Sequence, residues 1–202
     1  MMTRDELARR LLNACAEVIA SEDELTQIDA KFGDADHGLT MVKVANAIKG
    51  AVEESDGSIQ GLLDDAAMAV MVLNGGSAIP LWNTWLDGMQ EAAPDAEEMD
   101  AAQAKAMLSG ALEELADMSG AQVGDKTMMD AVIPATEAAC AAEGDVADVL
   151  AAGAAGAAAG AENSKNFPSK FGRAKSYGDK TIGTPDAGAV SMARFWGGLA
   201  KV

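Results

Sequence analysis

Positive charge is scarce in this sequence. Its 202 residues include 15 lysines and arginines against 32 aspartates and glutamates, so the formal net charge is −17. Such a surface repels phosphate backbones, which excludes nucleic acid as a partner. An anionic ligand therefore needs a metal cation, a helix N-terminus or a local basic residue in order to bind this chain.

Cysteine, aromatic residues and long apolar runs are also scarce. The two cysteines, Cys15 and Cys140, lie far apart in helical patterns, which predicts free thiols in a reducing compartment. The first residues lack the apolar stretch of a signal peptide. The longest run of small residues, 149–161, is too short and too weakly apolar to span a bilayer. We therefore expect a cytoplasmic protein that does not contact the membrane.

Apolar residues recur at helical spacing along most of the chain, and no segment shows the alternation of a strand. Thr3 and Glu6 have the spacing of a capping box before the first helix, and Ser58 is a candidate cap for the third. The sequence therefore predicts a single all-α domain over residues 1–202. The helical patterns cover residues 7–19, 42–52, 62–73, 81–89, 99–118, 127–142, 146–162 and 188–201.

The segment 151–160 consists only of alanine and glycine, with glycines at 153, 156 and 160. Spacings of three and four residues place these glycines on one helical face, where they permit close packing of a neighbouring helix. A flexible linker is the alternative interpretation, and we favour the packed helix.

Four glycine-containing breaks separate the helical patterns, at 27–40, 74–80, 124–130 and 171–188. Loops carry function when a rigid scaffold presents them. Four polar, glycine-rich breaks on a helical scaffold therefore indicate one composite site.

The first break contains three aspartates, Asp29, Asp34 and Asp36, within eight residues. Their carboxylates repel one another, and a hard divalent cation such as Mg²⁺ relieves that repulsion. The alternative is that they cap helices and form turns beside glycine. An EF-hand is a poor match. Counting from Asp34, position five is Gly38 rather than a ligand, and position twelve is Ala45 rather than glutamate.

The other breaks offer groups for binding phosphate. Gly75 and Gly76 permit close backbone approach before a helix N-terminus, although an ordinary turn capped by Ser77 is the alternative. Arg173 suits phosphate through its planar guanidinium group. His37, the only histidine, either hydrogen-bonds a ligand or packs in a turn. Together these parts supply what phosphoryl transfer requires, but no pocket for an acceptor.

Several stretches resemble the nucleotide-binding L subunit of dihydroxyacetone kinases (DhaL), equivalent to the C-terminal domain of the fused, ATP-dependent kinases. They occur in the order of the family and extend over nearly the whole chain. The matching stretches are 33–38 (Gly-Asp-Ala-Asp-His-Gly), 75–81, 124–128 (Gly-Asp-Lys-Thr-Met), 172–174 and 182–188.

This resemblance implies an antiparallel barrel in which the eight helical patterns enclose a core, with a nucleotide site formed by loops at one end. It implies that Asp29, Asp34 and Asp36 hold two magnesium ions on the phosphates of ADP or ATP, and that Arg173 supports phosphoryl transfer. The further nucleotide-binding residues that it implies are His37, Gly38, Leu39, Thr40, Gly76, Ser77, Ala78, Gly120, Met128, Asp186, Ala187 and Gly188.

The implied function is that of a kinase subunit. It passes a phosphoryl group to a short-chain ketose, such as dihydroxyacetone, that a separate K subunit holds on a histidine. The phosphoryl source is either exchangeable ATP or a phosphotransferase-system protein that recharges a retained ADP. A nucleotide-loaded module that signals to a regulator is the alternative function, a metal-dependent phosphohydrolase is a weaker one, and a homodimer is a possible assembly.

The sequence departs from the family pattern at four positions near the expected site. Ile79 replaces a usual glycine, Thr40 an asparagine, Ala187 a proline and Lys175 a serine. Because the three aspartates are intact, we expect nucleotide binding to survive these departures, whereas the identity of the ketose is less constrained.

Overall fold

The computed structural model describes residues 1–202 and is almost entirely helical, which confirms the predicted all-α class. The only strands are β1 (Met2–Thr3) and β2 (Glu98–Met99), which pair antiparallel. The helices are α1 (Arg4–Ala20), α2 (Glu22–Asp29), α3 (His37–Glu54), α4 (Ile59–Met71), α5 (Ala78–Ala92), α6 (Ala101–Ser119), α7 (Met129–Ala141), α8 (Val146–Asn163) and α9 (Ala187–Leu199), with 3₁₀ segments η1 (Ser164–Asn166) and η2 (Arg173–Thr181). No helix combines the length and the hydropathy that crossing a membrane requires.

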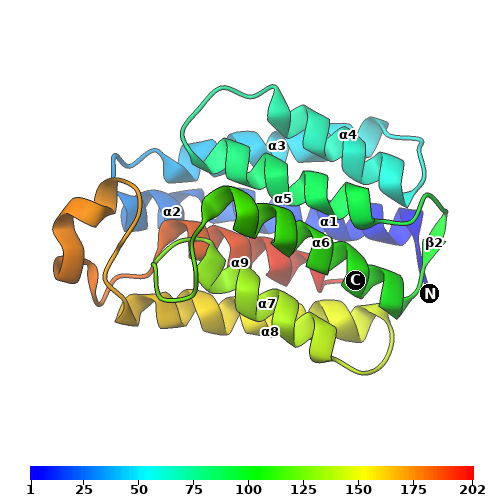
Figure 1. The fold of residues 1–202 in the computed structure, drawn as a ribbon. Helices are drawn as coiled ribbons and strands as arrows, with labels where there is room; N and C mark the ends of the chain where they lie inside the picture. Colours follow the sequence, from blue (N-terminus) through cyan, green and yellow to red (C-terminus); the bar gives the residue numbers. More distant parts are fainter.

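Eight of the helices form a closed ring. Contacts run in the order α1, α3, α4, α5, α6, α7, α8 and α9, and α9 packs against α1 to close the ring. Neighbouring helices run in opposite directions (Figure 1). The short α2 continues α1 after Ser21 and packs against α3 and α9. The predicted antiparallel eight-helix barrel is therefore confirmed.

Every second connection of the barrel lies at the same end, because the chain runs alternately up and down the ring. Residues 30–36, 72–77, 120–128 and 164–186 all connect helices at the end drawn on the left of Figure 1. The two termini and the β1–β2 pair lie at the opposite end. The four glycine-containing breaks of the sequence thus meet at one end of the barrel.

An aromatic cluster fills the middle of the barrel. Trp82 and Trp85 of α5 meet Phe195 of α9 edge to face, with ring centroids 5.2 and 5.6 Å away, and Trp196 packs on Trp85 at 6.3 Å. All four side chains are at most 1% exposed. Since α5 and α9 lie on opposite sides of the ring, these contacts join its opposite walls and bury a large apolar area.

Helix α8 packs closely through its glycines, as its sequence predicts. A Cβ atom at Gly156 would lie 2.9 Å from the carbonyl carbon of Pro134 and 3.0 Å from Cα of Ala135, both on α7. A Cβ atom at Gly153 would clash with the indole ring of Trp196 on α9. The segment is therefore a packed helix and not a linker.

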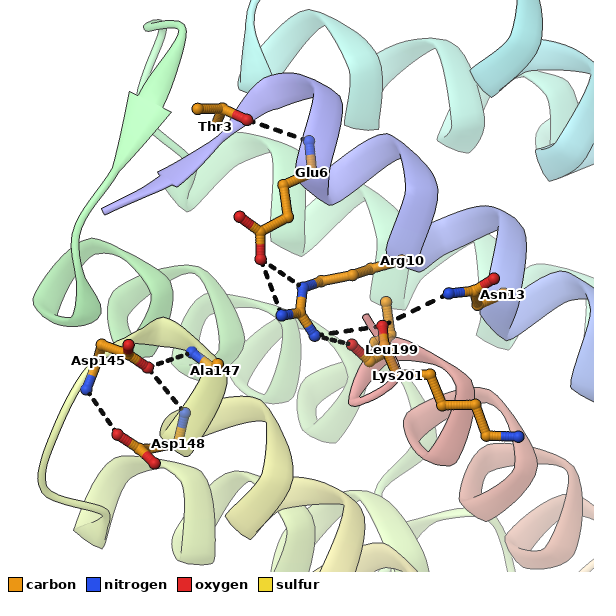
Figure 2. A network of polar contacts seen from close by, with 9 residues as sticks. All are labelled: Thr3, Glu6, Arg10, Asn13, Asp145, Ala147, Asp148, Leu199 and Lys201. Atoms are coloured by element: carbon orange, nitrogen blue, oxygen red, sulfur yellow. Dashed lines mark hydrogen bonds and ion pairs between the residues drawn. The ribbon is translucent and has the colours of Figure 1, made fainter.

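A buried arginine joins α1 to the end of α9 (Figure 2). Arg10 is 1% exposed, and it donates to Glu6 Oε1 at 2.8 Å and to the carbonyl oxygen of Leu199 at 3.0 Å. Thr3 caps α1 by accepting from the Glu6 N–H at 3.2 Å. The Glu6 carboxylate pairs with Arg10 and makes no reciprocal bond to Thr3, so the predicted capping box is half formed.

Several expected boundaries were wrong. Helix α2 lies partly inside the first expected break, and α3 begins at His37 rather than near residue 42. Met99 does not start a helix, because it pairs with Met2 across β1 and β2, and α6 begins after the capping residue Asp100. The fourth expected break contains the 3₁₀ segment η2.

Substituting Gly156→Ala should destabilise the protein by about 1–3 kcal/mol, because the added methyl group must push α8 away from the backbone of α7. Gly50→Ala is the matched control, since Gly50 lies within α3 with open space around its Cβ position. The control should stabilise the protein by up to about 1 kcal/mol through its higher helix propensity. Urea unfolding measures both effects, and equal free energies of unfolding for the two variants would contradict this packing.

Candidate nucleotide and metal site

A cavity of about 550 Å³ opens where the four connections meet, and residues of all four line it. Among the residues predicted from the sequence, three do not line it. Gly38 is buried against α2, Leu39 is 51% exposed, and Gly120 ends α6 with a left-handed φ of 61°. The predicted residues that line the cavity are Asp29, Asp34, Asp36, His37, Thr40, Gly76, Ser77, Ala78, Met128, Arg173, Asp186, Ala187 and Gly188.

The local fold brings the three aspartates together. Asp29 ends α2, Asp36 precedes α3, and a carboxylate oxygen of each of the three lies within 4.8 Å of the others. Ala35 turns the chain through a left-handed φ of 62°, so the loop folds back. Asp29 Oδ2 then accepts from the N–H groups of Asp36 and His37, at 3.1 and 3.4 Å. Asp29 thus stabilises the turn through Oδ2 and also lies beside the carboxylates of Asp34 and Asp36.

Repulsion among the three aspartates affects the pKa of Asp36. Partial burial raises the pKa of Asp36, and the carboxylates of Asp34 and Asp29 raise it further, whereas Arg173 opposes the shift. Arg173 Nη2 pairs with Asp34 Oδ2 at 2.6 Å. Three oxygen donors that repel one another beside one exposed guanidinium group fit a hard divalent cation such as Mg²⁺.

The second connection presents backbone and hydroxyl donors to the cavity. Helix α5 starts there, and the N–H groups of the lining residues Ser77 and Ala78 donate no hydrogen bond within the protein, whereas the Ile79 N–H bonds the carbonyl oxygen of Gly76 at 3.2 Å. Ser77 makes no capping hydrogen bond, so the alternative interpretation, an ordinary turn capped by Ser77, is not found. Ile79, at a usual glycine position of the family, is 4% exposed and packs over Gly75 instead of lining the cavity.

Lys126 lines the cavity and was given no role from the sequence. It is 5% exposed, and Nζ donates to the carbonyl oxygens of Ser164, Phe167 and Thr184 at 2.8, 3.1 and 2.5 Å. Burial lowers its pKa, while the Asp186 and Asp130 carboxylates oppose that shift. Its three bonds fix both ends of the long connection between α8 and α9. The motif around it, 124–128, was recognised, but these long-range acceptors leave no local signal.

Asp186 and His37 both line the cavity, Asp186 before the start of α9 and His37 at the start of α3. Asp186 caps α9 by accepting from the Ala189 N–H at 2.8 Å. Burial is the main cause that raises the pKa of Asp186 to about 7; Asp130 adds to it, whereas the Ala189 N–H and Lys126 oppose it. Burial also lowers the pKa of His37, whose Nε2 lies 3.1 Å from Ser191 Oγ. His37 is therefore a neutral imidazole at pH 7.

Residues 31–201 match the family described as the DAK2 domain. The chain belongs to this family. The first stretch of the match contains Asp34, Asp36 and His37, and its last part contains Asp186 and Gly188. The match thus includes the four connections that build the cavity except residue 30, and it confirms the resemblance on which the sequence interpretation depends.

Named relatives of the DAK2 domain include kinases of two lengths. The chain is 36% identical to a D-erythrulose kinase of Mycolicibacterium smegmatis, with 93% of this chain and 33% of that enzyme covered. It is 29% identical to the ADP-binding subunit DhaL of PEP-dependent dihydroxyacetone kinase 1 from Listeria innocua, with 95% and 94% covered. The chain thus spans about a third of the erythrulose kinase and nearly all of the DhaL subunit.

A solved structure shares the barrel of the DAK2 domain. The dihydroxyacetone kinase of C. freundii in complex with AMP-PNP and Mg²⁺ matches with a TM-score of 0.72 at 25% identity, covering 96% of this chain and 33% of that one.

Substituting Lys126→Met should destabilise the protein by about 2–4 kcal/mol, because three buried carbonyl oxygens lose their donor. Lys180→Met is the matched control, since Lys180 is exposed on the same connection and forms no ion pair. Thermal unfolding and limited proteolysis of residues 164–186 measure the effect. Equal behaviour of the two variants would show that Lys126 does not anchor the connection.

The stability of the protein should depend on the protonation of Asp186. The folded carboxyl group keeps a proton that the unfolded chain releases from about pH 3.8, so its contribution is lost as pH rises towards about 7. Asp186→Asn does not titrate but keeps the acceptor for Ala189. We expect the wild type to lose roughly 1–3 kcal/mol relative to Asp186→Asn between pH 5 and pH 8, measured by urea unfolding. Parallel pH profiles would contradict the shift.

Proposed function

We propose that the cavity binds ADP or ATP together with magnesium, and that the chain is the nucleotide-binding part of a kinase acting on a short-chain ketose. The observation that carries this proposal is the meeting of three carboxylates beside Arg173 and the N-terminus of α5 on one cavity. Carboxylates, a guanidinium group and helix N–H groups are the parts from which sites for metal-bound phosphates are built. The names of the relatives, dihydroxyacetone and erythrulose kinases, support the same ketose class.

Each group of the site has a role in this proposal. Asp29, Asp34 and Asp36 hold magnesium, two ions in all, and the bound metal neutralises phosphate oxygens during transfer. Arg173 gives up its ion pair with Asp34 and pairs with a phosphate oxygen instead. Ser77 and the first turn of α5 donate hydrogen bonds to the phosphates.

The rest of the nucleotide lies against the other walls of the cavity. His37 is neutral and offers a ring nitrogen without adding charge, and Thr40 lies one turn further along α3. Met128 forms an apolar wall, and the N-terminus of α9 at Ala187 and Gly188 closes the base. We assign no direct contact to the three predicted residues that lie outside the lining.

The acceptor ketose is held by a separate K subunit. The only histidine of this chain is His37, whose Nε2 lies 3.1 Å from Ser191 Oγ, so that ring nitrogen is not free to hold a substrate covalently. The cavity instead opens at the end of the barrel, where a partner can present the ketose to the phosphates. Relatives three times as long, in which this domain is one third of the chain, support a partner of this kind. The phosphoryl source is ATP or a phosphotransferase-system protein, which retention of ADP through dialysis distinguishes.

Calorimetric titration of the chain with ADP and with ATP, with and without Mg²⁺, tests the proposal. We expect binding that requires the metal and that Asp36→Asn weakens at least about tenfold, because one oxygen donor of the cation loses its charge. Asp56→Asn is the control, since it removes the same charge from an exposed residue at the far end of the barrel. No metal-dependent binding by the folded chain, or equal affinity of both variants, would refute the proposal.

A further inference from the structure

A short turn between two glycines covers one side of the cavity. Residues 173–177, here called the clasp, form a 3₁₀ turn between Gly172 and Gly178, whose φ angles are 60° and 50°. A Cβ atom at either glycine would meet nothing within 4 Å, so no neighbouring group packs against the two joints at that position. Glycine moves readily through this region of φ. The clasp is therefore a stiff unit with a flexible joint at each end.

The chain on either side of the clasp is firmly held. Lys126 binds the carbonyl oxygens of Ser164 and Thr184, which lie before and after it. The Ser169 N–H donates to Thr181 Oγ1 at 2.9 Å and closes the base of the loop. Movement of this connection is thus concentrated in the clasp, and the cavity-lining residue Arg173 moves with it.

Only the two ends of the clasp make specific contacts with the loop that carries the aspartates. At one end Arg173 pairs with Asp34 at 2.6 Å. At the other end the ring of Tyr177 packs against Phe32, with centroids 5.2 Å apart and planes at 58°. The side chains of the clasp make no other hydrogen bond or ion pair to the rest of the protein, and the Lys175 N–H donates to the carbonyl oxygen of the adjoining Gly172 at 3.4 Å.

The two contacts respond differently to a bound metal-nucleotide. Both Asp34 and Arg173 are needed by the ligand, so their ion pair is broken when the site fills. Both side chains are also largely exposed, 38% and 72%, and such pairs contribute little. The contact between Phe32 and Tyr177 uses no polar atom of the site. Of the two contacts with the loop of the aspartates, the ring contact is therefore the one that persists in both states.

We propose that the contact between Phe32 and Tyr177 keeps the clasp closed over the bound nucleotide and sets the rate at which the nucleotide leaves. This inference rests on the proposed nucleotide site and adds to it two positioning residues that touch neither the metal nor the phosphates. Opening the clasp requires separation of the two rings, and release of the ligand follows.

The test compares Tyr177→Ala, Phe32→Ala and the double variant with the wild type. Release of a fluorescent methylanthraniloyl-ADP in the presence of Mg²⁺ gives the dissociation rate. Trypsin cleavage after Arg173 and Lys175, without nucleotide, reports opening of the clasp independently of any ligand. We expect both rates to rise about fivefold in each single variant, as loss of an aromatic pair worth about 1 kcal/mol implies. The double variant should be no faster than the single ones, because one contact is lost in each case.

Tyr177→Phe is the matched control. The Tyr177 hydroxyl group makes no hydrogen bond, so the phenyl ring alone should keep both rates within about twofold of the wild type. Tyr177→Phe behaving like Tyr177→Ala would overturn the ring contact as the cause. If Tyr177→Ala binds the analogue normally and its release and cleavage rates are unchanged, the role of the ring contact is overturned while the proposed nucleotide site stands. Failure of the wild type to bind the analogue would overturn the proposed function and this inference with it, whatever the cleavage rates.

Discussion

The contact between aromatic rings at the centre of the barrel fixes the distance between α5 and α9 on opposite walls. Trp82 lies little more than one turn from the start of α5, and Phe195 lies in the second half of α9. Their rings meet at 5.2 Å, and Trp82 also lines the cavity. The N-termini of both helices, with Ser77 on one and Gly188 on the other, therefore face each other across a gap that the core determines. Packing of the hydrophobic core and the geometry of the site are thus coupled.

The site itself adds unfavourable charge to a molecule whose net charge is already −17. The fold keeps three carboxylates within 4.8 Å of one another, and their repulsion raises the pKa of Asp36 beyond the effect of burial. The loop holds this arrangement through the bonds of Asp29 to backbone N–H groups. Carboxylate oxygens held this close together fit a site for a hard divalent cation, whose charge offsets their repulsion.

Features set by local spacing were predictable, and features set by distant contacts were not. Helical periodicity gave the ring helices, the glycine spacing of 153–160 gave the packed α8, and short separations along the chain placed three aspartates together. Helix α2 was missed because it buries only Leu25. The bonds of Lys126 cross 38 to 58 residues, and Met99 lies outside its expected helix because it pairs with Met2 near the N-terminus. No local pattern reports such partners.

Both termini lie at the end of the barrel opposite the cavity, close to the hydrogen bonds of Arg10 with Glu6 and Leu199 (Figures 1 and 2). A polypeptide attached at either terminus would extend away from the four loops and leave the cavity open. One architecture therefore accommodates two gene arrangements, a free-standing subunit and a module within a longer chain. The relatives show both arrangements, with this domain forming 94% of a DhaL subunit and 33% of an erythrulose kinase. Fusion and fission of genes can alter how the module is tethered without remodelling its site.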